Sequence, residues 1–264
     1  MNEETLSEAW HKRFGEDPPG DFPAELVRHR SIRSFSNREV SESAVRYLVG
    51  CGQSASTSSN LQLWSVVSVQ DSERRQRIAE LCADQKQVHT ASWFLCFCAD
   101  HARLRASAQA QGESCAGLDY TEFMLMAAID ASLAAERLVC AAELLGMGVC
   151  YIGALRNHPQ EVNDFLKLPE GVVGLFGLCL GYPSEDGEEA IKPRLSPDDV
   201  WFREEYRLAS TDEYDHRMAA FYESQSMSTS VTWTQRSGRR ADGNHMTGRE
   251  VWKAWLESHG MGRR

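Results

Sequence analysis

The stretch from residue 119 to residue 146 constrains the fold most, because it is apolar almost all round. Its apolar residues recur at helical spacing, while its charged residues fall about seven apart on one narrow stripe. The apolar positions are Met124, Ala127, Ala128, Ala131, Ala134, Ala135, Leu138, Ala141, Ala142 and Leu145, and the charged ones are Glu122, Asp130, Glu136, Arg137 and Glu143. Such a helix has to be covered on nearly every side. We therefore expect it to pack in the core and, on another face, against a second subunit.

Short β-branched or apolar runs predict four strands around this helix, at 64–69, 93–99, 149–152 and 171–181. The last run is apolar throughout, so we expect it to be central in the sheet. Further helices are predicted at 41–51, 71–83, 159–166 and 212–224, with Asp71 as a cap. Because these elements do not form clean βαβ units, the predicted fold class is α+β rather than a Rossmann sheet.

The C-terminal part carries a different signal. Residues 225–246 are rich in Ser, Thr, Gly and Arg and are expected to form a long loop. Thr247-Gly248-Arg249-Glu250 has the pattern of a capping box, which predicts the start of a last helix.

Composition places the chain among ordinary globular proteins. Its 264 residues, 42% of them hydrophobic, suffice for one sizeable α/β domain or two small ones. No run of about 18 apolar residues occurs, so no membrane span is expected. The acidic N-terminus also lacks the apolar segment of a secretory signal. Eight cysteines without a C-x-x-C pair favour buried, reduced thiols in a cytoplasmic protein.

The charge is distributed unevenly. The net charge of −10 argues against general nucleic-acid binding. From Val231 to the end, seven Lys and Arg residues stand against three Asp and Glu residues, which gives +4 and leaves −14 for residues 1–230. A basic tail on an acidic body indicates either a local anion site or a merely solvated segment.

Two basic segments have the composition of a phosphate site. His29-Arg30-Ser31-Ile32-Arg33 groups an imidazole, a hydroxyl and two guanidinium groups, and alternate residues of an extended stretch share a face. Lys192-Pro193-Arg194 projects two cations from a segment that proline holds extended. Taken singly, either segment can also be an ordinary basic turn or surface loop.

Two further segments suit contact with a flat polar ring. Residues 56–62 offer many short donors and acceptors, although such runs are commonly turns. Gly153 and Ala154 follow a predicted strand, where small residues admit a flat ligand or simply allow tight packing.

Several catalytic motifs are missing from the chain. The dinucleotide fingerprint G-x-G-x-x-G, the P-loop, G-x-S-x-G and H-E-x-x-H are all absent. Cys96 and Cys98 with His101 resemble a metal set, but the two cysteines share one face of a predicted strand among apolar neighbours. Core packing is therefore favoured, and no metal site is predicted.

The order of these segments resembles the oxygen-insensitive nitroreductases, in particular the NADPH-dependent subgroup that includes bacterial flavin reductases. The matching pieces are His-Arg-Ser-Ile-Arg, the serine run, Tyr-Ile-Gly, and Leu-Phe-Gly-Leu-Cys-Leu-Gly-Tyr-Pro followed by Lys-Pro-Arg-Leu. The resemblance runs from residue 26 to residue 195 and continues more weakly to the end. It implies a nitroreductase-like fold, with a central, mostly antiparallel sheet flanked by helices and an intertwined homodimer. The implied segments are an N-terminal extension (1–24), an FMN-binding core (25–210) and a C-terminal helical and loop excursion (211–264).

The resemblance also implies an FMN site at the dimer interface. The positions that match the phosphate contacts are His29, Arg30, Ser31, Lys192 and Arg194, and Arg33 matches a cation near the pyrimidine edge of the flavin. Ser56, Thr57 and Ser58 match a segment that reaches the FMN of the other subunit, and Gln85 matches a glutamine that bonds the isoalloxazine. Tyr151, Ile152, Gly153 and Ala154 match the backbone that runs along the ring near N5.

The implied reaction has two steps of ping-pong type. NADPH or NADH passes hydride to flavin N5 and leaves, and then a nitroaromatic, a quinone or free flavin is reduced in its place. No side chain is expected to act as acid or base, since the cofactor carries the chemistry and the protein positions it.

Three departures from the family pattern affect these expectations. Ala154 replaces the second glycine of Tyr-Ile-Gly-Gly, and Ala83-Asp84-Gln85-Lys86-Gln87 stands where the family has Gly-Gly-Gln-Lys-His. The arginine-rich loop of NADPH-specific relatives is here Ser226-Met227-Ser228-Thr229-Ser230-Val231. The arginines that remain to bind the nucleotide are Arg236, Arg239, Arg240 and Arg249.

Other functions stay open from the sequence. A dedicated flavin reductase or a reductive dehalogenase-like enzyme keeps FMN but changes the acceptor. A non-catalytic FMN-binding protein is favoured by Ala154 and by the altered loop at 226–231. An anion-binding or nucleic-acid module needs only the basic tail, although we expect neither a nucleic-acid nor a membrane partner.

Overall fold

The structure is a computed structural model that describes residues 5–187 and 189–264. The chain forms two compact units, each built from separate stretches of sequence. The first unit comprises residues 1–30 and 189–246, and the second unit comprises residues 31–188 and 247–264. The segments 1–24, 25–210 and 211–264 expected from the sequence are defined by resemblance and stay a prediction.

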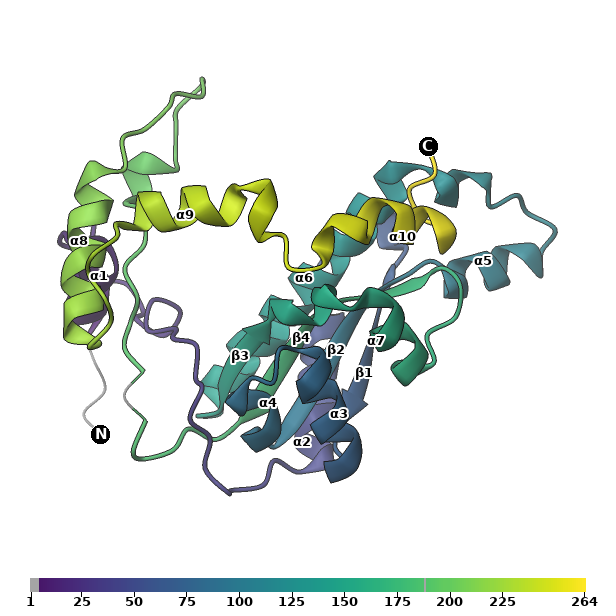
Figure 1. Cartoon of the computed structure of the whole chain (residues 1–264), viewed down its shortest axis with the longest axis horizontal. Coiled ribbons are helices and arrows are strands. Elements are labelled where there is room, and N and C mark those ends of the chain that lie inside the picture. Colours follow the sequence, from purple (N-terminus) through teal and green to yellow (C-terminus); the bar gives the residue numbers. More distant parts are fainter. Residues whose placement is uncertain (1–4, 188) are drawn as a thin grey trace. The chain divides into compact units, whose positions relative to one another are not determined.

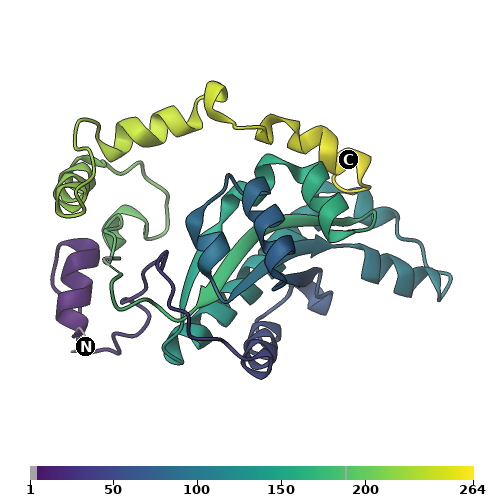
Figure 2. The same ribbon diagram turned by 60° about the horizontal axis from the view of Figure 1, so that its bottom comes forward.

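The second unit is built on one antiparallel sheet (Figures 1 and 2). Its strands are β1 (Trp64–Val69), β2 (Trp93–Asp100), β3 (Gly148–Ile152) and β4 (Val172–Gly181), in the order β1-β2-β4-β3. All three pairings are antiparallel, and β4 lies between β2 and β3. The α+β class, the antiparallel sheet and the central place of the last strand are therefore confirmed.

Helices cover both faces of this sheet. One layer contains α2 (Glu42–Gln53) and α6 (Thr121–Leu144), which bury the aromatic and aliphatic residues of one sheet face. The opposite layer contains α3 (Ser72–Leu81), α4 (Lys86–Thr90) and α7 (Pro159–Leu166). Helix α5 (Ala102–Gln109) follows β2, and short 3-10 turns lie at Ser58–Asn60 (η1), Ala116–Asp119 (η2) and Gly153–Asn157 (η3). The predicted cap of α3 forms, since Asp71 accepts from Arg74 N–H, and α2 is capped in the same way by Ser41, which accepts from Ala44 N–H.

Helix α6 has the two apolar faces that its sequence predicts. Its inner face is lined mostly with alanine, and the buried residues include Ala127, Ala131, Ala134, Ala135, Leu138, Val139 and Ala142. On its outer face Leu125, Ile129 and Leu133 are 54%, 52% and 45% exposed. These three residues, spaced by four, form a stripe that the chain's own residues leave uncovered, and we call it the α6 stripe.

Five of the eight cysteines are buried, and the other three are partly buried. All eight are free, and the Cys96 and Cys98 sulfurs lie 3.8 Å apart inside the core. Burial raises the pKa of Cys82 to about 12, so this thiol is protonated at neutral pH. Across residues 5–187 and 189–264, no group of three or more His, Cys, Asp or Glu side chains is arranged to hold a metal ion.

The first unit consists of helices packed around a small aromatic cluster. Its helices are α1 (Leu6–Phe14), α8 (Asp212–Ser224) and α9 (Trp233–Ala241), with short turns at Pro197–Asp199 (η4) and Gly243–His245 (η5). The cluster is formed by Tyr214, Met218 and Tyr222, with Trp233 packed against it.

The prediction of a loop over 225–246 is wrong, because α9 occupies its middle. Thr232 and Gln235 form a capping box at the start of α9, and the Trp233 ring lies 4.9 Å from the Tyr214 ring. One aromatic anchor and one cap therefore hold a helix whose other residues are polar. Composition alone hides such a helix, because Trp233 is its only large apolar residue.

The predicted capping box at Thr247–Glu250 is also wrong. Thr247 and Gly248 have φ values of +54° and +84°, and Gly248 takes the N-cap place of a short turn, η6 (Arg249–Val251), without a side-chain cap. Helix α10 (Trp252–Ser258) follows. A Cβ on Gly248 would lie 2.6 Å from the Asn157 carbonyl oxygen, so close packing requires a glycine there.

None of the helices in the described part of the chain is both long and apolar enough to cross a membrane.

Candidate functional site

The residues predicted to bind FMN and nucleotide are divided between the two units. The first unit contains His29, Arg30, Lys192, Arg194 and the three arginines of α9. The second unit contains the remaining predicted residues, which are Ser31, Arg33, Ser56, Thr57, Ser58, Gln85, Tyr151, Ile152, Gly153, Ala154 and Arg249.

The backbone of Lys192-Pro193-Arg194 is held by hydrogen bonds at every carbonyl. Lys192 O accepts from Arg13 Nη1 at 2.8 Å, and Pro193 O accepts from the Tyr214 hydroxyl at 3.0 Å. Arg194 O accepts from Arg217 Nη2 at 3.0 Å. The side chains of Lys192 and Arg194 remain exposed. The backbone that carries these two cations is therefore held in place by side chains of α1 and α8.

Arg13 connects this segment with the other basic segment of the first unit. Its guanidinium donates to the carbonyls of Lys192, Val27 and His29, and its own carbonyl accepts from Arg194 N–H at 2.8 Å. Arg13 is only 6% exposed. No sequence signal marks this residue, because an arginine in the last turn of an N-terminal helix belongs to no motif.

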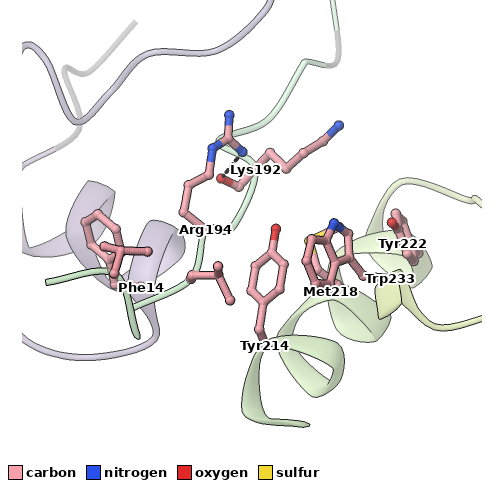
Figure 3. A pocket seen from close by; sticks show the side chains of 9 residues that line it. Phe14, Lys192, Arg194, Tyr214, Met218, Tyr222 and Trp233 are labelled. Atoms are coloured by element: carbon pink, nitrogen blue, oxygen red, sulfur yellow. Dashed lines mark hydrogen bonds between the residues drawn. The ribbon is translucent and has the colours of Figure 1, made fainter. Parts of the chain in front are cut away.

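A pocket of about 550 Å³ lies beside the two cations. Figure 3 shows Lys192 and Arg194 on one side of it and the rings of Tyr214, Tyr222 and Trp233 on another, with the Tyr214 hydroxyl pointing toward the basic segment. Phe14, Leu195, Val200 and Met218 complete the lining. Aromatic walls beside two cations suit a ligand that is flat and anionic.

The arginines of α9 differ in how they are used. Arg236 donates to Ser228 O and Val231 O and lies over the Tyr222 ring, so it organises the loop that precedes the helix. Arg240 donates to His245 O at 2.8 Å. In the part of the chain that the structure describes, the exposed Arg239 guanidinium has no hydrogen-bond partner.

In the second unit, the chain after Ser31 pairs with β3 at Ile32 and with the segment after β4 at Phe35, which bridges Pro183. Ile32 N–H donates to Val149 O at 2.8 Å, and Ile32 is buried against Gly148, where a Cβ would lie 2.4 Å from the Ile32 side chain. Because side chains alternate, Ser31 and Arg33 face away from the core, as the sequence predicts.

The segment Tyr151–Ala154 joins the end of β3 to η3. Ile152 is buried in the core, whereas the Tyr151 hydroxyl donates to Glu136 Oε2 at 3.1 Å and its ring packs edge-on against Phe176. Burial and the neighbouring Glu136 carboxylate both raise the pKa of Tyr151, so this phenol is neutral.

Turn η3 is held by the C-terminal segment. Arg249 Nε donates to Asn157 Oδ1 at 2.8 Å, and Trp252 Nε1 donates to Arg156 O at 2.8 Å. The structure therefore gives Arg249 a contact within the second unit. Its predicted role in nucleotide binding stays a prediction.

The loop that carries Ser56–Ser58 is anchored by a residue that the sequence analysis missed. Asp130 of α6 is fully buried, and its two carboxylate oxygens accept from Ser58 N–H at 2.8 Å and Leu63 N–H at 3.1 Å. Between these amides, Ser59, Asn60 and Gln62 have φ values of +50°, +56° and +53°. The sequence pattern places Asp130 on the charged stripe of the helix, and this placement is wrong, because the structure buries Asp130 on the inner face.

The turn before Gln85 contains Ala83 and Asp84 in place of the two glycines of the family pattern. Ala83 and Asp84 have φ values of +60° and +49°, which is the left-handed region that glycine adopts without cost. The Gln85 amide donates to Cys82 O at 3.0 Å and accepts from Gln87 Nε2 at 2.7 Å. One N–H of Gln85 is left for a ligand.

Comparisons with known proteins match most of the chain. Residues 26–182 match the model of the nitroreductase family, and residues 192–264 match that family's C-terminal domain. The chain is 37% identical over 217 residues to an NADPH-flavin oxidoreductase of Vibrio harveyi, covering 80% of this chain and 86% of the relative. It is 36% identical over 197 residues to an NADPH FMN reductase of Bacillus subtilis, covering 74% and 78%.

A solved structure is similar over most of the chain as well. The NADPH:FMN oxidoreductase of Vibrio harveyi in complex with NAD+ superposes with a TM-score of 0.79 at 34% identity, covering 91% of this chain and 98% of that one.

Replacing Ala83 by glycine tests the strain in the turn before Gln85. We expect Ala83→Gly to raise the free energy of unfolding by about 0.5–1 kcal/mol, because glycine removes the left-handed penalty of alanine. Ala106→Gly, at an exposed position of α5, should instead lower it by about 1 kcal/mol. Urea denaturation measures both changes, and a loss of stability in Ala83→Gly would contradict the strain.

Proposed function

The chain belongs to the nitroreductase family and is an NAD(P)H-dependent flavin oxidoreductase, and we propose that it binds FMN through the cations and hydroxyls described above. In this proposal His29, Arg30, Ser31, Lys192 and Arg194 hold the phosphate. The chemistry of this donor set fits FMN, because a phosphate dianion is bound best by several charge-assisted hydrogen bonds.

The anchored Lys192-Pro193-Arg194 backbone is the observation that carries the proposal. Its three carbonyls are bonded to Arg13, Tyr214 and Arg217, while both cationic side chains are exposed. Since the backbone is already fixed, binding an anion costs little further ordering of the chain.

The remaining residues are assigned to the isoalloxazine ring of FMN, according to the charge and hydrogen bonds that each can supply. Arg33 faces away from the core and supplies positive charge, which stabilises a reduced flavin carrying negative charge. Bound FMN supplies the redox chemistry, with hydride entering at N5 and two electrons leaving to a nitroaromatic, a quinone or free flavin. The backbone of Tyr151–Ala154 orients the ring, and the neutral Tyr151 adds no charge beside it. The Ser56–Ser58 loop, held by Asp130, supplies donors to the FMN of the partner subunit.

The coenzyme is NADPH or NADH, and we assign the recognition of its ribose end to α9. Arg236 and Arg240 bond carbonyls of their own unit, whereas the exposed Arg239 is uncommitted in residues 5–187 and 189–264. Arg239 is therefore the arginine most available to contact a 2′-phosphate. Eight free cysteines favour a reducing compartment, so we place the enzyme in the cytoplasm.

We further propose that the protein is a homodimer that pairs through the α6 stripe. Leu125, Ile129 and Leu133 are about half exposed on one face of a 24-residue helix. A row of three aliphatic side chains of this kind marks an interface, and a two-fold axis buries it against its own copy.

The phosphate assignment predicts a selective loss of affinity. The double variant Lys192→Ala/Arg194→Ala should weaken FMN binding by about tenfold to a hundredfold, the worth of charge-assisted hydrogen bonds. Its affinity for riboflavin, which lacks the phosphate, should stay within about twofold of wild type. Fluorescence titration of the apoprotein measures both constants. Lys253→Ala, a cation on α10, is the control, and an equal loss for both ligands would refute the phosphate role.

The dimer assignment predicts a change of mass. Ile129→Glu and Leu133→Glu place a charge in the apolar contact, so light scattering coupled to size exclusion should report half the wild-type mass. Val251→Glu, an exposed apolar residue outside the stripe, should leave the mass unchanged. A wild-type monomer, or a stripe variant that keeps the dimer mass, would rule out this interface.

A further inference from the structure

Helix α1 lies outside the residues that match the family model, which begin at residue 26. It is nevertheless a well-formed element. Thr5 and Glu8 make a capping box at its start, and Gly15, at φ +76°, ends it. The only buried residues of the helix are Ala9 and Arg13. A helix that buries an arginine as one of its two inward residues is built to place that side chain.

Arg13 donates hydrogen bonds to three backbone carbonyls. Its guanidinium donates to Lys192 O at 2.8 Å, to Val27 O at 2.9 Å and to His29 O. The first carbonyl belongs to one basic segment, and the third belongs to the other. The two segments are separated by more than 160 residues of sequence, and Arg13 holds both. The planar guanidinium carries these donors on two separate nitrogens, Nη1 and Nη2. A lysine has three donors on a single nitrogen and does not reproduce this geometry.

A second contact fixes the direction of the basic segment. Arg194 N–H donates to the Arg13 carbonyl at 2.8 Å. Arg13 therefore bonds the Lys192–Arg194 backbone at two points, the Lys192 carbonyl and the Arg194 amide. Arg217 of α8 donates to Arg194 O, and its side chain also packs against Gly15, where a Cβ would lie 2.5 Å from Arg217 Cδ. Residues of both α1 and α8 therefore hold the backbone of the Lys192–Arg194 segment by hydrogen bonds.

We infer that Arg13 is a positioning residue for the anion site, which brings the His29 and Lys192–Arg194 segments together so that their side chains converge on one phosphate. The inference rests on the proposed FMN-binding function and assigns to the N-terminal helix a part in it. Arg13 is buried and donates to backbone carbonyls, and its buried charge adds to the positive potential of the site.

Substitution of Arg13 by lysine tests this role, because lysine keeps the positive charge but lacks the planar guanidinium group. We expect Arg13→Lys to weaken FMN binding about tenfold while riboflavin binding stays within about twofold. A merely structural role would weaken both ligands equally. Arg105→Lys, the same exchange at an arginine of the second unit that donates to Gly260 O, is the matched control and should change neither constant.

Each outcome decides between the claims. If wild type does not prefer FMN to riboflavin, the phosphate site itself fails. If wild type prefers FMN and Arg13→Lys keeps that preference, the role of Arg13 is refuted and the FMN proposal stands. An equal loss for both ligands in Arg13→Lys also refutes the positioning role.

Hydrogen exchange on the wild type keeps the inference testable if Arg13→Lys does not fold. The amide of Arg194 donates to the Arg13 carbonyl, so phosphate binding should slow its exchange. We expect added protection of this amide with FMN and none with riboflavin. Equal protection by both ligands, or none by either, would overturn the inference.

Discussion

The packing of α6 through its alanine face onto the antiparallel sheet is the contact on which the second unit depends. Small side chains at Ala127, Ala131 and Ala134 let the helix pack closely against its neighbours. Helix α2 packs closely against α6 at Gly52. A Cβ on Gly52 would lie 3.0 Å from Ala134 O, so even one methyl group would be too close to the α6 backbone. The close approach also brings Asp130 within hydrogen-bonding distance of the 58–63 loop. One helix thus orders the core, a candidate ligand loop and a candidate subunit face.

The sequence predicted those elements whose signals are local and redundant. The strands at β1 and β4, the cap at Asp71 and helix α8 each combine residue propensity with a boundary signal, and they appear where expected. Helix α9 was missed because its stability comes from one tryptophan packed on Tyr214, a contact that periodicity does not show. The cap expected at Thr247 failed because Gly248 packs against the Asn157 carbonyl, which lies far away in sequence.

The same distinction applies to the candidate site. Residues that touch a ligand can be named from motifs, because short runs such as Lys192-Pro193-Arg194 are local. The residues that hold those runs in place act through backbone carbonyls and amides, as Arg13 and Asp130 do. Any sequence offers such partners, so no motif marks them. The departure at Ala83 and Asp84 is the intermediate case, since the family's paired glycines become intelligible once both φ values are seen to be positive.

The central claim is that this chain turns over a bound flavin with a nicotinamide coenzyme. The most direct measurement mixes the FMN-loaded protein anaerobically with NADPH, and separately with NADH, while the flavin band near ~450 nm is followed by stopped flow. We expect rapid loss of the band with at least one nucleotide and its return when a quinone or nitroaromatic is added. Bound FMN that neither nucleotide bleaches would contradict it and would leave a protein that holds the cofactor without using it.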